Sequence, residues 1–289
     1  MYKIENDKLS IAIHPKGAEL SSIYDKQDQL EYMWNADPDF WGKTSPVLFP
    51  IVGTLKSNVF YFKGNTYEMT RHGFARDKNF EVTEQTQSTI KFTLLSNAET
   101  LKVFPFEFDF SILYTLENKR LSVTYIVNNL GNESMYFSVG GHPAFKLPIS
   151  DELNYEDYYL QFNKIENTGR WPISKDGLIE VESEPLMTNT NQLPLKKEMF
   201  YKDAIVFKNL ASDEVQLKSL KDSHGFSFKF HGFPFLGIWA AKDADFLCIE
   251  PWCGIADSVN ANQHLEEKEG IEKLAPGENF ERDWSITIF

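Results

Sequence analysis

Cysteine, basic residues and long apolar runs are all scarce in this sequence. Its two cysteines, Cys248 and Cys253, are too few for the disulfide framework of a small secreted protein. Lys and Arg number 29 against 42 Asp and Glu, and the resulting net charge of −13 disfavours nucleic acid or an anionic membrane as a partner. No apolar run is long enough for a transmembrane helix, and residues 1–7 lack the apolar core of a signal peptide. These absences together predict a cytoplasmic protein.

Helical periodicity is scarce as well, whereas alternation of apolar and polar residues is common. Residues 106–114 and 121–127 alternate on either side of a polar turn at 117–120, a pattern typical of an antiparallel hairpin. Residues 59–62 and 66–69 flank a second turn, residues 262–271 suit a short helix or a loop, and further strand-like runs occupy residues 9–14, 90–95, 136–139, 226–230 and 284–289. We therefore predict an all-β fold, built as a large antiparallel β-sandwich.

The chain gives no sign of a boundary between domains. Hydrophobic residues make up 42% of it, with 24 Phe, which is ample for one large core. Residues 148–197 are polar and contain scattered Pro, Asn and Gly, so we expect long loops there, with one strand at 158–162. The sequence predicts a single domain over residues 1–289.

Three short segments combine glycine, aromatic rings and a group that can move protons. They are residues 71–76 (RHGFAR), 140–145 (GGHPAF) and 248–254 (CIEPWCG), which contain His72, His142 and Glu250. A sugar site needs ring faces for stacking and an acid and a base near neutral pH. Each segment alone also fits a structural role, such as a hydrogen-bonded histidine at a strand end or an exposed glutamate before a turn.

Alternation within these segments suggests how their side chains are arranged. If residues 245–252 form a strand, Glu250 shares one face with Phe246, Cys248 and Trp252, and partial burial there raises the pKa of its carboxyl. A strand at 71–76 would likewise place His72, Phe74 and Arg76 on one face. The paired glycines before His142 would let a ligand approach closely.

Metal and nucleophile chemistry receive less support. His72, His142 and Glu250 could form a set of two histidines and one carboxylate, but no closely spaced pair of ligands supports a metal. The two cysteines lack a second cysteine pair for zinc, and no nucleophile-elbow or phosphate-loop motif is present. We expect a site without metal or cofactor.

Taken in order, several motifs resemble the aldose 1-epimerase (galactose mutarotase) family, and in particular its LacX-like branch. The motifs are LFPIVG at 48–53, HGFAR at 72–76, GGHPAF at 140–145, EPW at 250–252 and LAPGE at 274–278. The resemblance spans residues 11–288 and implies the family's supersandwich, a large antiparallel β-sandwich.

The resemblance also implies roles for individual residues. His142 matches the general acid, Glu250 the general base, and His72 the histidine that binds the sugar near its ring oxygen. Asp203 resembles the aspartate that binds sugar hydroxyls. Where relatives carry an arginine after the FPxxG motif, this chain has Thr54, and Arg71, Arg76 or Lys56 could substitute. Trp252 or Trp239 could stack on the sugar.

The implied reaction interconverts the α and β anomers of a hexose. Glu250 takes the proton of the anomeric hydroxyl while His142 protonates the ring oxygen, and ring closure reverses the two roles. The alternatives are a non-catalytic carbohydrate-binding or regulatory protein, a hexose-6-phosphate 1-epimerase, and carboxylate-based glycoside hydrolysis with Asp203 and Glu250. The acidic charge and Thr54 favour a neutral hexose as the partner, and we expect a monomer or a homodimer.

Overall fold

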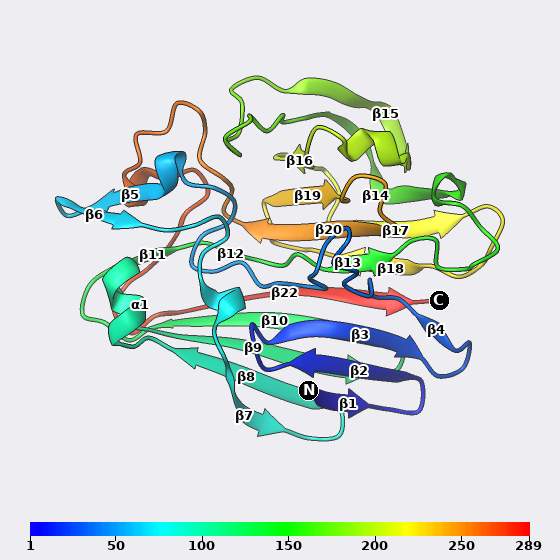
Figure 1. Ribbon diagram of the computed structural model, residues 1–289, viewed down its shortest axis with the longest axis horizontal. Helices are drawn as coiled ribbons and strands as arrows, with labels where there is room; N and C mark the ends of the chain where they lie inside the picture. The colour runs from blue at the N-terminus through cyan, green and yellow to red at the C-terminus, as the bar shows by residue number, and fades with distance from the viewer.

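A single nine-stranded antiparallel sheet runs through the computed structural model, which describes residues 1–289 (Figure 1). Its strands, in spatial order, are β15 (Glu184–Pro194), β14 (Tyr158–Arg170), β17 (Glu214–Ser219), β18 (Phe226–Lys229), β22 (Asn279–Ile288), β10 (Arg120–Asn129), β9 (Phe108–Glu117), β8 (Thr89–Leu95) and β7 (Glu81–Gln85). Apolar residues alternate along β9 and β10, so one face of this sheet is buried.

Two smaller sheets form the second layer and cover that face. One contains β1 (Tyr2–Glu5), β2 (Leu9–His14), β3 (Glu19–Asp25) and β4 (Leu30–Glu31). The other contains β12 (Val139–Gly140), β20 (Phe246–Cys253), β19 (Phe235–Trp239) and β16 (Ile205–Phe207), and β13 (Ala144–Lys146) also pairs with β20.

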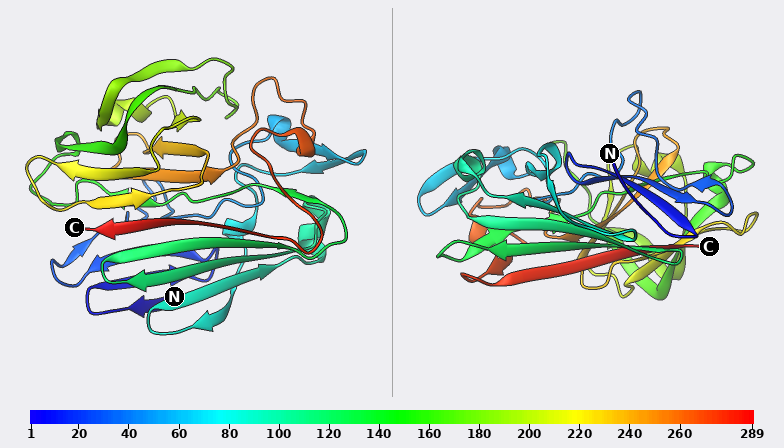
Figure 2. Two further views of the ribbon diagram at one scale, coloured as in Figure 1. Left: turned by 180° about the vertical axis from the view of Figure 1, so that it is seen from behind. Right: turned by 90° about the horizontal axis from the view of Figure 1, so that it is seen from below.

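Aromatic contacts join the two layers. The ring of Tyr2 on β1 meets Phe92 on β8 edge-on, and Phe145 on β13 meets Phe228 on β18. The views in Figure 2 place the small sheets against the large one along its length. The predicted all-β antiparallel sandwich is therefore confirmed.

The remaining elements are short. Two further two-stranded sheets are the hairpin of β5 (Val59–Phe62) with β6 (Asn65–Glu68), and the pair of β11 (Met135–Phe137) with the distant β21 (Glu272–Leu274). The one α-helix, α1 (Ala98–Val103), begins at a capping box formed by Asn97 and Thr100. Five short 3-10 helices are η1 (Lys56–Asn58), η2 (Ala75–Asp77), η3 (Tyr155–Asp157), η4 (Lys197–Phe200) and η5 (Leu265–Glu267). None of the helices has the length and apolar character needed to cross a bilayer.

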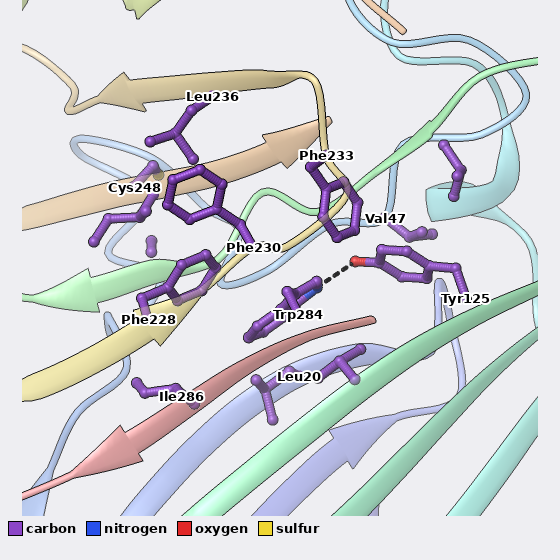
Figure 3. Close-up of a cluster of buried hydrophobic side chains, with 14 of the residues drawn as sticks. Leu20, Val47, Tyr125, Phe228, Phe230, Phe233, Leu236, Cys248, Trp284 and Ile286 are labelled. Atoms are coloured by element: carbon purple, nitrogen blue, oxygen red, sulfur yellow. Dashed lines mark hydrogen bonds between the residues drawn. The ribbon is translucent and has the colours of Figure 1, made fainter. Parts of the chain in front are cut away.

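Large side chains fill the space between the layers. In Figure 3, Trp284 of β22 donates a hydrogen bond from Nε1 to the hydroxyl of Tyr125 on β10, over 2.9 Å. Leu236 of β19 and Cys248 of β20 belong to the same cluster and come from the opposite layer. The paired hydroxyl and indole let two amphipathic rings be buried without an unsatisfied polar atom.

The predicted hairpins at 106–127 and 59–69 are confirmed, as is the strand near 158–162. Residues 262–271, expected to form a short helix or a loop, contain the 3-10 turn η5. The prediction of long loops over 148–197 was wrong for part of that segment. There β14 continues to Arg170 and pairs with β15, an edge strand whose side chains are largely exposed. An edge strand exposed on both faces has no apolar alternation to reveal it.

Candidate active site

A cavity of about 540 Å³ opens beside the five-stranded sheet. Its walls come from the loop after β4, the loops around η2 and η4, the loop between β14 and β15, the ends of β19 and β20, and the segment between β12 and β13. Most of the residues proposed from the sequence line this cavity: Arg71, His72, Arg76, His142, Asp203, Trp239, Glu250 and Trp252. Thr54 and Lys56 do not line it. The fold thus brings the three segments together.

Strand register places His142 directly opposite Glu250. Gly140 pairs with Trp252 and Ala144 with Cys248, so the same register aligns residue 142 with residue 250. The imidazole Nε2 lies 3.3 Å from a carboxylate oxygen of Glu250, and both side chains are buried. Glu250 lies on β20 and His142 in the short segment between β12 and β13, so the sheet holds a potential acid and base within hydrogen-bond reach of each other.

Glycines flanking this pair make room for protein side chains. A Cβ on Gly140 would lie 2.7 Å from the Trp252 ring, and one on Gly237 would lie 2.5 Å from it. A Cβ on Gly141 would lie 2.7 Å from the Tyr125 hydroxyl. We expected Gly140 and Gly141 to let a ligand approach closely, and this was wrong. The Trp252 ring fills the space beside Gly140, and the Tyr125 hydroxyl fills the space beside Gly141.

Burial controls the charge of the pair. It raises the pKa of the Glu250 carboxyl well above its ordinary value, with Arg71 opposing and Asp203 reinforcing the shift. Burial, followed by Arg71, lowers the pKa of His142 to about 3. The raised pKa of Glu250 was predicted, whereas the lowered pKa of His142 was not. Both shifts favour the uncharged forms, a protonated carboxyl on Glu250 and a neutral imidazole on His142.

Aromatic rings cause the burial of His142. Trp41 stacks on the imidazole at 4.9 Å between ring centroids, while Trp239 and His72 meet it edge-on at 5.6 and 5.7 Å. Phe246 stacks in turn on Trp41 at 5.5 Å, so the predicted strand face carrying Phe246 and Glu250 leads into the site. Sequence analysis missed Trp41, which lies in a loop about a hundred residues before His142.

His72 is held by a tight turn rather than by the strand suggested above. It has φ +69°, and Gly73 follows at φ +71°, where a Cβ would lie 2.3 Å from the Phe49 carbonyl oxygen. Phe74 packs into the core against Phe49, away from the cavity. The expectation that Phe74 and His72 share one strand face was therefore wrong.

The tautomer of His72 follows from its backbone partner. The Gly53 N–H donates to Nδ1 over 3.1 Å, and burial, then Arg71, lowers the pKa of His72 well below its usual range. A neutral imidazole that accepts at Nδ1 carries its hydrogen on Nε2. Arg71 Nε also points its N–H at Nε2 over 3.2 Å, but a neutral imidazole accepts at only one nitrogen, and the backbone N–H of Gly53 is the less movable of the two donors. His72 offers the cavity an N–H donor.

Other proposed residues divide between the cavity and its supports. Asp203 accepts from the Ala204 N–H, and one of its oxygens lies 3.9 Å from Arg71. Thr54 lies behind the cavity wall, packed against Gly177. Lys56 could not replace the missing arginine, because its ammonium donates to the Val259 carbonyl outside the cavity.

Three cations in the cavity wall escaped sequence analysis. Lys43, Lys202 and Lys242 line the cavity together with Arg71 and Arg76. Their only local signal is that Lys202 precedes Asp203 and that Lys43 follows Trp41 closely. The Trp252 indole nitrogen and His142 Nδ1 are also buried at this site without a hydrogen-bond partner, so the wall retains unused polar groups.

A metal would find a different donor set from the one considered above. His142, Cys248 and Glu250 each offer an atom within 4.8 Å of the others. Histidines that bind metals usually donate their second ring N–H to a neighbouring acceptor, and His142 Nδ1 has none. Burial raises the pKa of the Cys248 thiol well above its usual range, which opposes thiolate ligation. These features suit a proton-transfer pair better than a metal centre.

Known proteins are similar to this chain in sequence and fold. The family model described as aldose 1-epimerase matches residues 1–287. Protein LacX (chromosomal) of Lactococcus lactis subsp. lactis is 32% identical, covering 99% of this chain and 98% of its own. A galactose mutarotase related enzyme from Lactobacillus acidophilus has a TM-score of 0.94 at 38% identity, covering 100% of this chain and 97% of its own. A galactose mutarotase-like protein from Lactobacillus casei ATCC 334 has a TM-score of 0.94 at 32% identity and full coverage of both chains.

Proposed function

Because this chain belongs to the aldose 1-epimerase family, we propose that it interconverts the α and β anomers of a hexose, with His142 as acid and Glu250 as base. The observation that carries this proposal is the buried contact of 3.3 Å between their side chains. Sugar binding alone needs hydroxyl partners and ring faces, but it does not need a proton-transfer pair. The pair therefore favours the enzyme over a purely carbohydrate-binding or regulatory protein.

The reaction begins from the ion-pair form of the two residues. The Glu250 carboxylate removes the proton of the anomeric hydroxyl, His142 gives its proton to the ring oxygen, and the bond between C1 and that oxygen breaks. The aldehyde turns about C1–C2, and the ring closes on its other face as both protons return. One proton enters and one leaves the pair at each stage, so no cofactor is required.

Burial assists the ring-opened stage in this scheme. After ring opening, Glu250 is protonated and His142 is neutral, which is the charge state that burial favours for each group. The ion-pair form that precedes it is stabilised by the short distance between the charges. The ion-pair form and the uncharged form of the two residues hold the same number of protons and have the same net charge. The reaction can therefore run in both directions through the aldehyde.

Other residues would orient the sugar. His72 donates from Nε2 toward the ring oxygen or a neighbouring hydroxyl, and Asp203 with Arg71 binds hydroxyls. The rings of Trp41, Trp239 and Trp252 line the cavity and offer stacking faces. We also propose that residues 1–289 act as one domain, since one hydrophobic cluster continues through both layers of the sandwich.

The test is the approach of pure α-D-galactose or α-D-glucose to anomeric equilibrium, followed by polarimetry above the spontaneous rate. Wild-type protein should accelerate it catalytically, whereas Glu250→Gln should not. Glu281→Gln, an exposed glutamate on β22, is the matched control and should behave as wild type. A wild-type protein that binds sugars without accelerating the exchange of their anomers would support the carbohydrate-binding alternative.

A further inference from the structure

The charge of the cavity wall opposes that of the whole protein. Five basic residues line the cavity, Lys43, Arg71, Arg76, Lys202 and Lys242, against two carboxylates, Asp203 and Glu250. The chain as a whole has 29 basic and 42 acidic residues. Burial raises the pKa of Glu250 and so favours its uncharged form. The cavity is therefore a positive region on a negative protein.

This concentration of cations is unfavourable without a ligand. Burial lowers the pKa of Arg76, and Arg71 lowers it further by repulsion between the two guanidinium groups. A neutral hexose presents only hydroxyls and would leave this repulsion unchanged. An anion would offset it, and such complementarity is the usual reason for a cleft lined by one sign of charge.

The five cations differ in their existing partners. Lys43 and Arg76 each lie 3.9 Å from Asp77, so one carboxylate already offsets part of their charge. Lys202 and Lys242 form no ion pair. Lys242 lies over the Tyr201 ring, 5.4 Å from its centroid, and the Tyr201 hydroxyl engages the neighbouring Asp243.

We propose that the sugar carries a phosphate monoester, held between Lys202 and Lys242 on the wall formed by Tyr201, while C1 lies at His142 and Glu250. A phosphate dianion matches two lysines that lack carboxylate partners, and Arg71 can turn from Asp203 to add a guanidinium fork. The cavity volume of about 540 Å³ falls in the usual range for small-molecule sites. This inference rests on the proposed function for the position of C1, and it replaces the neutral hexose expected from the sequence.

The experiment compares kcat/KM for anomer exchange of glucose, glucose 6-phosphate and glucuronate, together with galactose and its 6-phosphate. Spontaneous exchange is measured without protein and subtracted. We expect the phosphate esters to exceed their parent sugars by about tenfold or more, in line with one or two charge-assisted contacts. Raising the salt concentration should reduce that advantage and leave the parent sugars unaffected.

The double variant K202Q/K242Q should lower the ratio of phosphate to parent-sugar kcat/KM by about tenfold or more. Lys8→Gln, an exposed lysine between β1 and β2, should leave the ratio unchanged. Circular dichroism checks that each variant is folded. Equal wild-type kcat/KM for phosphate and parent sugar, or a ratio unchanged in the double variant, would overturn the inference. A preference for glucuronate equal to that for the phosphate would overturn the assignment of a dianion.

A binding measurement separates this inference from the proposed function. Tryptophan fluorescence of Glu250→Gln protein, titrated with glucose 6-phosphate, reports binding through the three cavity tryptophans without turnover. If no sugar is turned over but phosphate binding depends on Lys202 and Lys242, the inference stands and the catalytic proposal fails. If anomers exchange without preference for phosphate, the catalytic proposal stands and the inference fails.

Discussion

Replacement of Glu250 by glutamine should abolish most of the anomer-exchange activity. The same replacement should increase the free energy of unfolding relative to wild type as pH rises from 5 to 8. Glutamine has the same shape, so its amide can still meet His142 Nε2 at the observed 3.3 Å. It cannot accept the proton of the anomeric hydroxyl. Loss of a positioned base typically lowers a rate by about 10² to 10⁴-fold, which corresponds to roughly 3 to 5 kcal/mol of transition-state stabilisation.

The effect on stability has the opposite sign. Because burial raises the pKa of Glu250, its protonation contributes stability that is fully present below the ordinary value of 4.5 and is lost as pH rises through the folded-state pKa. Each unit of that shift is worth about 1.4 kcal/mol. Glutamine remains neutral throughout. The variant should therefore gain stability relative to wild type as pH rises from 5 to 8.

Two assays on the same protein samples decide the matter. Polarimetry or exchange NMR gives the rate of anomer exchange, and urea unfolding at pH 5 and pH 8 gives the free energy of unfolding. The difference between wild type and variant isolates Glu250, because every other titrating group is common to both. A variant that exchanges anomers within threefold of the wild-type rate would refute the role of Glu250 as the base. If wild type and variant differ in free energy of unfolding by the same amount at pH 5 and pH 8, Glu250 does not have a raised pKa in the folded protein.

Four further outcomes follow from the geometry. His142→Asn should lose about 10² to 10⁴-fold in rate with an unchanged fold, whereas His14→Asn, at an exposed strand end, should remain active. The pH profile of kcat/KM for a neutral sugar should show no acid limb near 6.5, since burial lowers the pKa of His142 to about 3, and a limb at 6.5 would contradict this. Activity should survive exhaustive chelation, and loss with EDTA followed by recovery with zinc would favour a centre built on His142, Cys248 and Glu250. Gly73→Ala should destabilise the fold by well over 1 kcal/mol in urea unfolding, because its Cβ would meet the Phe49 carbonyl at 2.3 Å, while Gly64→Ala, also at positive φ but with open space around it, should be milder.

Local patterning predicted the parts of the fold that bury one face of a strand. The hairpin of β9 and β10 alternates along its whole length, because one side packs in the core and the other is partly exposed. The hairpin of β14 and β15 breaks this rule. Its outer strand has few buried side chains, so only pairing with a neighbour reveals it as a strand.

The site was predictable in its residue types and not in its geometry. His142 and Glu250 were identified beside glycine and aromatic residues. Their facing arrangement depends on a register between strands more than a hundred residues apart, which one sequence does not specify. The roles of Gly140 and Gly237 show the same limit, since each makes space for Trp252 from a different strand.

Electrostatics of the cavity was the least predictable property, and it carries the largest consequence. Lys43, Lys202 and Lys242 resemble any surface lysine in sequence, and only the fold collects them around a buried neutral pair. Two conditions then coexist in one cavity. Aromatic rings bury His142, and burial favours the uncharged forms of His142 and Glu250. Cations in the same wall would attract the phosphate of the proposed substrate before chemistry begins. Binding energy taken from a remote charged group can hold C1 against His142 and Glu250, and that energy is the means by which an enzyme offsets the entropy lost in orienting a small sugar.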